Sequence, residues 1–307
     1  MIPTKEVVMS IDLKQYIKER CELIDSRLMM AMPSETELPF SLHKSMRYST
    51  FAGGKRLRPL LLLAACEAVG GEVNTALPAA CAMEMIHTYS LIHDDLPAMD
   101  NDDFRRGSPT NHKVFGDAIA ILAGDALLTQ AFILLSSPFF ASNVPPDRIL
   151  AVIHEIASAA GSRGMVGGQV VDMESEGKKD LDLPTVQYIH THKTGALIKA
   201  SVKSGALLGG ADERQLSSIT RFGEMIGLAF QIADDILDIE GTTEQLGKSA
   251  GSDLARGKAT YPAVIGVAES RMRAAELLEM AVESLESIGE KADPLREIAR
   301  FIISRKS

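Results

Sequence analysis

The chain has 307 residues, of which 46% are hydrophobic, and a formal net charge of −9 at pH 7. That hydrophobic content is enough to bury a substantial interior. An acidic protein gains nothing from releasing the counterions of DNA or RNA, so nucleic acid is not an expected partner. A strongly anionic substrate would need basic residues gathered locally against this background.

The cysteines and the N-terminus indicate in which cellular compartment the protein is expected. Cys21, Cys66 and Cys81 form no CxxC pair and leave an odd number. Neither a disulfide scaffold nor a zinc site is expected, and a reducing cytoplasm fits best. Residues 1–20 carry charges throughout, unlike a signal peptide. The apolar stretches are short and interrupted by glycine, so we expect no membrane span.

Helical patterns follow one another along the chain. Ser10 and Asp12 suit the start of a first helix over 13–28, and Pro59 suits the first turn of a second over 60–69. Further helices are predicted over 79–95, 116–135, 147–160, 185–208, 212–240 and 262–287. Alternating strand patterns are nearly absent, and no Pro/Ser-rich linker divides the chain. The sequence therefore predicts an all-α fold and a single domain over residues 1–307.

An acidic cluster, QIADDILD, lies within the predicted helix 212–240. Gln231, Asp234, Asp235 and Asp238 fall at i, i+3, i+4 and i+7, which is one helix face. Like charges on one face repel each other, and a cation would relieve the repulsion. Oxygen ligands without nearby Cys or His favour Mg²⁺. A solvated acidic face is the alternative interpretation.

A second acidic cluster, HDDLPAMD, occupies residues 93–100. Pro97 lacks an N–H and breaks a helix, so we expect the helix to end at Asp95 or Leu96. The chain should then turn and bring Asp100 back toward Asp94. Two acidic clusters inside apolar helices, facing each other across a bundle, would form a clamp for several metal ions.

Basic residues gather in four segments. In GGKRLRP (53–59), glycines let the backbone approach an anion, while Lys55, Arg58 and the next helix N-terminus supply positive charge. Arg105-Arg106 follows the 93–100 cluster, and Lys193-Thr194 lies on a later helix. A Gly-rich segment flanked by Lys248 and Lys258 suits a loop that closes over phosphates. The alternatives are solvated turns, ion pairs with the neighbouring carboxylates, and a plain surface loop.

Three further polar residues, His87, Gln169 and Asp172, each allow two interpretations. His87 shares the helix face of Asp94, which favours a hydrogen bond to substrate over a core role. Gln169 and Asp172, after Gly167-Gly168, suit either a polar wall of the site or a helix kink.

These segments together resemble the trans-isoprenyl diphosphate synthase (polyprenyl synthetase) family. The matching motifs are GGKRLRP, HDDLPAMDNDDFRRG, GGQVVD, HKTG, FQIADDILD and GKATYP, in the family's order from about residue 50 to 262. DDxxD alone is shared with terpene cyclases, whereas DDxxxxD with the trailing RRG and a second DDxxD is far more specific. The likeness is greatest to the bacterial farnesyl diphosphate synthases, and next to the geranylgeranyl diphosphate synthases.

The resemblance implies a helical bundle with the active-site cavity in its core, usually a homodimer, and three Mg²⁺ ions for which Mn²⁺ may substitute. Asp94 and Asp100 would hold two ions and Asp234 the third, with Asp95 and Asp238 in support. The allylic diphosphate would be bound by Arg105, Lys193, Thr194, Gln231, Lys248 and Lys258. Isopentenyl diphosphate would be bound by Gly54, Lys55, Arg58, His87 and Arg106. Asp94, Asp100, Asp234, Lys193 and Arg105 are the expected catalytic set.

The implied reaction joins isopentenyl diphosphate to an allylic diphosphate. A class I terpene cyclase would share the metals but would not need the second diphosphate site that GGKRLRP and RRG supply. A head-to-head synthase would use two like allylic substrates, and a non-catalytic synthase subunit would lack acidic residues that are intact here.

Product length is expected to stop at C15, farnesyl diphosphate, with C20 as the alternative. Tyr89 lies five residues before Asp94, about 7.5 Å along a helix axis. The helical wheel places Ser90 nearer the Asp94 face, and packing alone could account for Tyr89. A large aromatic residue at this position, with the Pro97-Ala98 insertion, looks like the bacterial farnesyl pattern.

Overall fold

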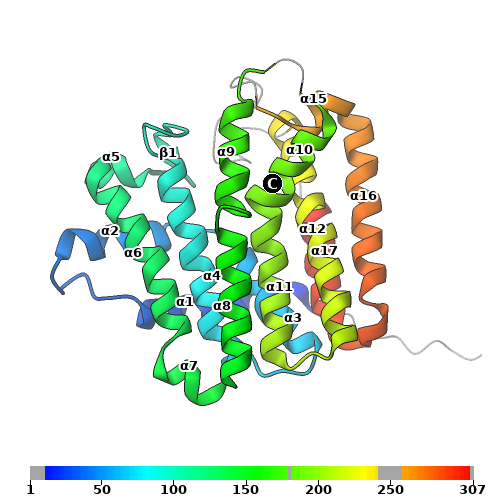
Figure 1. Cartoon of the computed structure of the whole chain (residues 1–307), viewed down its shortest axis with the longest axis horizontal. Helices are drawn as coiled ribbons and strands as arrows, with labels where there is room; N and C mark the ends of the chain where they lie inside the picture. Colours follow the sequence, from blue (N-terminus) through cyan, green and yellow to red (C-terminus); the bar gives the residue numbers. More distant parts are fainter. Residues whose placement is uncertain (1–10, 179–180, 241–257, 305–307) are drawn as a thin grey trace, which may run out of the picture.

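The computed structural model describes residues 11–178, 181–240 and 258–304, and long helices stand side by side through most of it (Figure 1). In chain order the elements are α1 (Leu13–Ala31), α2 (Phe40–Thr50), α3 (Leu57–Ala68), α4 (Val73–Asp94), β1 (Phe104–Arg105), β2 (Ser108–Pro109), α5 (Asn111–Phe115), α6 (Asp117–Leu135), α7 (Pro138–Asn143), α8 (Pro146–Ala160), α9 (Met165–Ser175), α10 (Leu183–Ile189), the π-helix η1 (His190–Gly195), α11 (Ala196–Gly209), α12 (Glu213–Glu240), α15 (Tyr261–Ile265), α16 (Val267–Ser284), the 3₁₀-helix η2 (Glu286–Ala292) and α17 (Asp293–Ser304). The predicted all-α fold and helical bundle are confirmed.

The core is built on two apolar clusters that meet at α3 and α11. One gathers residues of α1, α4, α6 and α8, and the other residues of α12, α16 and α17. α3, with the sequence LRPLLLLAACEA, is buried nearly all round, as a helix that is apolar on every side should be. Gly205 of α11 permits the close crossing, because a Cβ there would overlap the carbonyl oxygen of Leu62.

Several helix bounds differ from the predictions for local reasons. The helix predicted from residue 79 begins at Val73, so that Pro78 lies inside α4. The helix predicted over 262–287 was wrong as a single element, because Gly266 at φ 82° separates α15 from α16. α2, α9 and α17 were not predicted. α9 runs unbroken through Gln169 and Asp172, so the predicted alternative of a helix kink there is wrong.

The stretch Asp117–Asn143, which spans α6 and α7, is long and apolar enough to cross a membrane by length and composition alone. In the bundle its inner side packs on α4 through the fully buried Ala123, Leu127 and Ala131. The opposite side carries exposed apolar residues together with Asp125. Packing in the core therefore accounts for part of its apolar character.

The functional segments gather at one end of the bundle. The β1–β2 hairpin, α10 and α15 all lie at the upper end in Figure 1. α4 reaches this end at its C-terminus, and Lys258, just before α15, lies 3.6 Å from Asp100, just after α4. The fold thus brings together segments more than a hundred residues apart in sequence.

Candidate active site

The chain after α4 turns back on itself, as the sequence predicted. α4 ends at Asp94, and the backbone N–H of Asp100 donates to the carbonyl oxygen of Asp94 at 2.8 Å. The helix end and the turn place both residues at the same edge of the bundle, because Pro97 cannot continue the helix.

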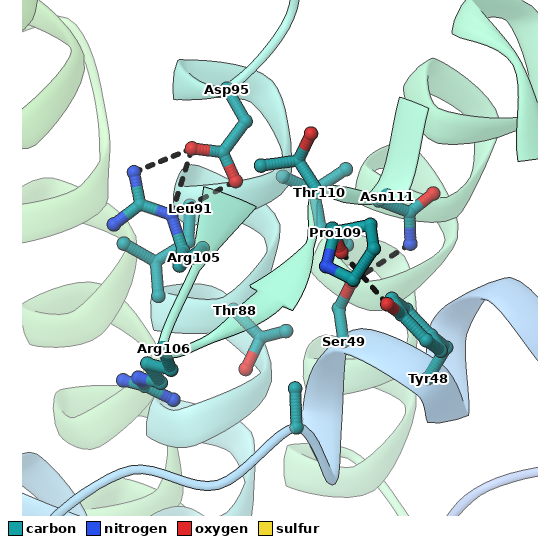
Figure 2. A pocket seen from close by; sticks show the side chains of 12 residues that line it. Tyr48, Ser49, Thr88, Leu91, Asp95, Arg105, Arg106, Pro109, Thr110 and Asn111 are labelled. Atoms are coloured by element: carbon teal, nitrogen blue, oxygen red, sulfur yellow. Dashed lines mark hydrogen bonds and ion pairs between the residues drawn. The ribbon is translucent and has the colours of Figure 1, made fainter. Parts of the chain in front are cut away.

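Asp95, the second carboxylate of this cluster, is engaged by Arg105. Both of its oxygens accept from the guanidinium, at 2.8 and 2.9 Å from Nε and 2.5 Å from Nη2 (Figure 2). The β1–β2 hairpin carries Arg105 back over α4, and the two residues line a cavity together with Thr88 and Arg106. Arg105 is thus paired with a carboxylate in the described structure, while its role in the allylic site and the role of Asp95 as a metal ligand stay predictions.

The surroundings of Asp94 make ionisation of its carboxyl group unfavourable. Burial raises the pKa of Asp94 to about 6, the charge of Lys193 opposes the rise, and the charge of Asp100 adds to it. A carboxylate that is costly to ionise in the free protein gains most from a bound cation.

The carboxylates of the QIADDILD cluster (residues 231–238) do not share one environment. Asp235 is 5% exposed and Asp238 2% exposed. Oδ2 of Asp235 accepts from His190 Nε2 at 2.7 Å and from the backbone N–H of Tyr261 at 2.9 Å. The predicted binding of a cation by the whole acidic face therefore does not include Asp235, whose carboxylate is already hydrogen-bonded within the protein.

Within the part of the chain that the structure describes, no three carboxylate or imidazole groups converge on one metal position. Mg²⁺ keeps several waters and is usually held by one or two carboxylates together with substrate phosphates. Asp94 and Asp100 lie at and just after the end of α4, and Asp234 and Asp238 lie on α12. These carboxylate oxygens therefore fit Mg²⁺ ions whose remaining ligands include oxygens of a diphosphate.

Cations of the predicted allylic site face these carboxylates. Lys193 Nζ donates to Asp172 Oδ2 at 2.6 Å. Burial lowers the pKa of Lys193, but the charges of Asp172 and Asp94 outweigh it and the net shift is upward. Thr194 lies next to Lys193 in η1, and Gln231 is a half-buried residue of α12. Lys248 lies outside the described residues.

Several basic side chains lie close together at the predicted isopentenyl site. Arg58 Nε is buried without a hydrogen-bond partner. Burial lowers the pKa of Arg58 to about 10, while the charge of Glu84 raises it and that of Arg106 lowers it further. Burial also lowers the pKa of His87 well below its usual value, and Arg58 and Arg106 add to the effect. Guanidinium groups held this close together suit a bound anion.

The glycine-rich loop contacts Arg106 through its backbone. Arg106 Nη1 donates to the carbonyl oxygen of Gly53. A Cβ at Gly54 would overlap the Arg106 guanidinium, and Gly54 itself has φ 130°. Gly54 therefore allows the loop to lie against Arg106, while Lys55 is exposed at its tip.

Arg56 is a functional position that the sequence reasoning missed. It adopts φ 48°, and its guanidinium donates to Asp25 Oδ1, Glu84 Oε1 and the Thr50 carbonyl, each at 2.8 Å. These bonds anchor the loop between Lys55 and Arg58 to α1, α2 and α4. In the sequence, its position next to Lys55 and close to Arg58 indicated a role for Arg56, but nothing there indicates that its side chain is buried.

Tyr89 and Ser90 lie on α4 below the carboxylates. The Tyr89 side chain is 7% exposed and its ring meets that of His93 edge-on at 5.7 Å. Burial raises the pKa of Tyr89 to about 12, and Asp94 adds to the rise. Ser90 Oγ donates to the carbonyl oxygen of His87 within the helix at 2.8 Å.

Comparison with known proteins identifies the family. A family model described as polyprenyl synthetase matches residues 40–298. A geranylgeranyl diphosphate synthase of Cyanophora paradoxa is 51% identical over 303 residues, which is 99% of this chain and 100% of the relative. A farnesyl diphosphate synthase of Geobacillus stearothermophilus is 49% identical over 96% of this chain and 98% of its own. The crystal structure of an FPP/GFPP synthase of Zymomonas mobilis, 39% identical, aligns with a TM-score of 0.85 over 96% of this chain and 100% of its own.

The helical bundle and these relatives are those of a prenyltransferase. The chain belongs to the polyprenyl synthetase family. It is thus a trans-prenyl diphosphate synthase, a transferase of isoprenoid biosynthesis, in a family that is generally Mg²⁺-dependent. The relatives carry both farnesyl and geranylgeranyl names at nearly equal identity, so they do not separate C15 from C20 products.

Proposed function

We propose that the protein condenses isopentenyl diphosphate with dimethylallyl and geranyl diphosphates and stops at (2E,6E)-farnesyl diphosphate. The observation that carries the C15 assignment is the buried, bulky Tyr89, about 7.5 Å along α4 from Asp94. A chain whose diphosphate is held at Asp94 and Asp100 and which grows along α4 would meet this ring.

The site residues divide between two diphosphates. Lys193, Thr194, Gln231 and Lys258 bind the allylic diphosphate beside the carboxylates, with Arg105 and Lys248. Isopentenyl diphosphate is bound by Gly54, Lys55, Arg58, His87 and Arg106. This division is supported by the contacts of Lys193 and Lys258 with acidic residues, and by the unpartnered Nε of Arg58 close to other cations.

The reaction follows from this placement. The bond between C1 of the allylic substrate and its diphosphate oxygen breaks, and the isopentenyl double bond attacks C1. A proton then leaves the isopentenyl unit, and the departed diphosphate is the base. The cations stabilise charge on the leaving group, and bound Mg²⁺ would supply further stabilisation of the same kind.

Three Mg²⁺ ions per site, replaceable by Mn²⁺, complete the proposal. Asp94 and Asp100 hold two and Asp234 holds the third, with Asp95 and Asp238 in support. The raised pKa of Asp94 supports its part in this assignment, because a bound cation would offset the cost of ionising it.

A C20 product is the second candidate, favoured by the geranylgeranyl diphosphate synthase names among the relatives. Labelled isopentenyl diphosphate is incubated with dimethylallyl, geranyl or farnesyl diphosphate and Mg²⁺, and the products are separated by chromatography. The C15 proposal expects farnesyl diphosphate to accumulate and to be a poor primer. Mainly C20 product from a farnesyl primer contradicts it, and no product from any primer contradicts the condensation itself.

Homodimer formation is proposed through the outer side of α6. The exposed apolar side chains Val114, Ile121, Leu122, Ile133 and Phe139 lie on α5, α6 and α7. Apolar residues concentrated on one side of a molecule indicate a protein partner, and a second copy presents the same surface. We also propose a cytoplasmic location, supported by the free thiols of Cys21, Cys66 and Cys81.

A further inference from the structure

The middle carboxylate of the QIADDILD cluster (residues 231–238) links three elements. Asp235 lies on α12, and its Oδ2 accepts from His190 Nε2 at 2.7 Å and from the backbone N–H of Tyr261 at 2.9 Å. His190 is the first residue of η1, and Tyr261 is the first residue of α15. One buried oxygen atom therefore connects α12, η1 and α15.

The linked backbones are those that carry the proposed site residues. Asp235 lies between Asp234 and Asp238, and His190 is three residues before Lys193. Tyr261 is three residues after Lys258. The His190 and Tyr261 rings also pack at 5.4 Å between centroids, and His190, Tyr261 and Asp235 are all buried.

The π-helix is held closely on two other sides. A Cβ at Gly168 of α9 would overlap the backbone nitrogen of Lys193. A Cβ at Gly227 of α12 would lie 2.9 Å from the Cα of Gly195. The middle and the end of η1 therefore rest on neighbouring backbone, and the bond to Asp235 fixes its beginning. π-helical turns are often found at functional sites.

We propose that Asp235 is a positioning residue and not a metal ligand, and that with His190 it sets the place of Lys193 relative to Asp234. Turning its carboxylate toward a metal would leave His190 Nε2 and the Tyr261 N–H buried and unpaired. The inference rests on the proposed function, because it assumes that Lys193 binds the allylic diphosphate.

The test compares His190→Ala, His190→Gln and Asp235→Asn. His190→Ala should raise KM for the allylic diphosphate by roughly tenfold, because it removes one buried charge-assisted hydrogen bond. KM for isopentenyl diphosphate and the Mg²⁺ concentration for half-maximal rate should change by less than about twofold. His190→Gln keeps an N–H donor and should recover most of the loss. Asp235→Asn should resemble His190→Ala, and the double variant should be no worse than either.

A binding measurement makes the test independent of turnover. Calorimetric titration with inorganic diphosphate and Mg²⁺ should show weaker binding to His190→Ala and Asp235→Asn, and near wild-type binding to His190→Gln. If His190→Ala does not fold, the contrast between His190→Gln and Asp235→Asn carries the test. A raised Mg²⁺ requirement for Asp235→Asn with no effect of His190→Ala would overturn the inference, as would additive effects. Should the wild type fail to condense its substrates while these binding differences remain, the proposed function fails and the positioning role stands.

Discussion

At the scale of single residues, the site contains polar groups that the protein satisfies and others that it leaves to ligands. Asp95 pairs with Arg105, and Arg56 donates to Glu84 Oε1 at 2.8 Å. Arg58 Nε is buried with no hydrogen-bond partner, and Asp94 is ionised only at a cost. Leaving such groups unpaired lowers stability and prepares the site for charged substrates.

The buried His87 makes part of this loss of stability depend on pH. Its pKa in the folded state is well below the usual 6.5, because of burial and of Arg58 and Arg106. In the unfolded chain His87 therefore takes up a proton near pH 6.5, whereas in the folded chain it does so only at a much lower pH. The free energy of unfolding therefore decreases as the pH falls below 6.5. The loss reaches at most about 1.4 kcal/mol per pH unit.

His87→Gln removes this titration while keeping a polar side chain. Thermal unfolding at pH 7.5 and 5.5 should show a smaller drop in Tm for His87→Gln than for the wild type. An equal drop in both proteins would show that His87 takes up its proton in the folded state. Other histidines are common to both proteins and cancel in the comparison.

Tyr89 is the residue on which product length is expected to depend. Tyr89→Ala removes the ring below Asp94 and should give C20 or longer products, read by chromatography of labelled products. The truncation opens a cavity and costs roughly 3–5 kcal/mol of stability, so the assay is run well below the new Tm. Tyr89→Phe keeps the ring and should still stop at C15. Unchanged products from Tyr89→Ala would assign the ring to packing alone.

Single residues were only partly predictable from the sequence. The motifs located both acidic clusters and the turn that brings Asp100 to Asp94, because proline and helical spacing act locally. Arg56 and Asp235 were not assigned their roles, because these depend on partners from distant elements, Glu84 for one and His190 and Tyr261 for the other. Spacing along one helix cannot show which of several carboxylates points to a neighbour.

At the scale of elements, backbone contacts at glycine set how closely helices approach. Gly205 brings α11 against α3, and Gly168 brings η1 against α9. The single helix predicted over 185–208 is in fact α10, η1 and α11. Apolar periodicity does not distinguish a π-helical turn from an α-helical one, because the cause is tertiary contact on either side of it.

Gly168→Ala tests the contribution of this contact to the site. The added Cβ meets the backbone of Lys193, so η1 must shift and Lys193 with it. We expect KM for the allylic diphosphate to rise by about tenfold or more and Tm to fall, with overpacking costing roughly 1–3 kcal/mol. Val166→Ala, at an exposed position of the same helix, is the matched control and should leave both near wild type. A Gly168→Ala enzyme with unchanged kinetics would mean that η1 does not depend on this contact.

At the scale of the whole molecule, charge and apolar surface are unevenly distributed. A chain of net charge −9 nevertheless gathers Arg58, Arg105 and Arg106 at one site. Exposed apolar side chains gather on α5–α7. The fold could be predicted because helix after helix carries its own signal, whereas the outer surface of α6 could not, since its apolar residues resemble core residues in sequence.

The outer surface of α6 leads to a prediction about assembly. Leu122 is 52% exposed and Ile133 55% exposed, and both lie on α6. In a dimer formed through this helix, a charge at either position would be buried without a partner, at a cost of several kcal/mol. Leu122→Glu and Ile133→Lys should therefore sediment as monomers at concentrations where the wild type sediments as a dimer. Leu150→Lys, at a 67% exposed position on α8, is the matched control and should remain dimeric. A monomeric wild type, or variants of α6 that stay dimeric, would show that the second copy does not bind here.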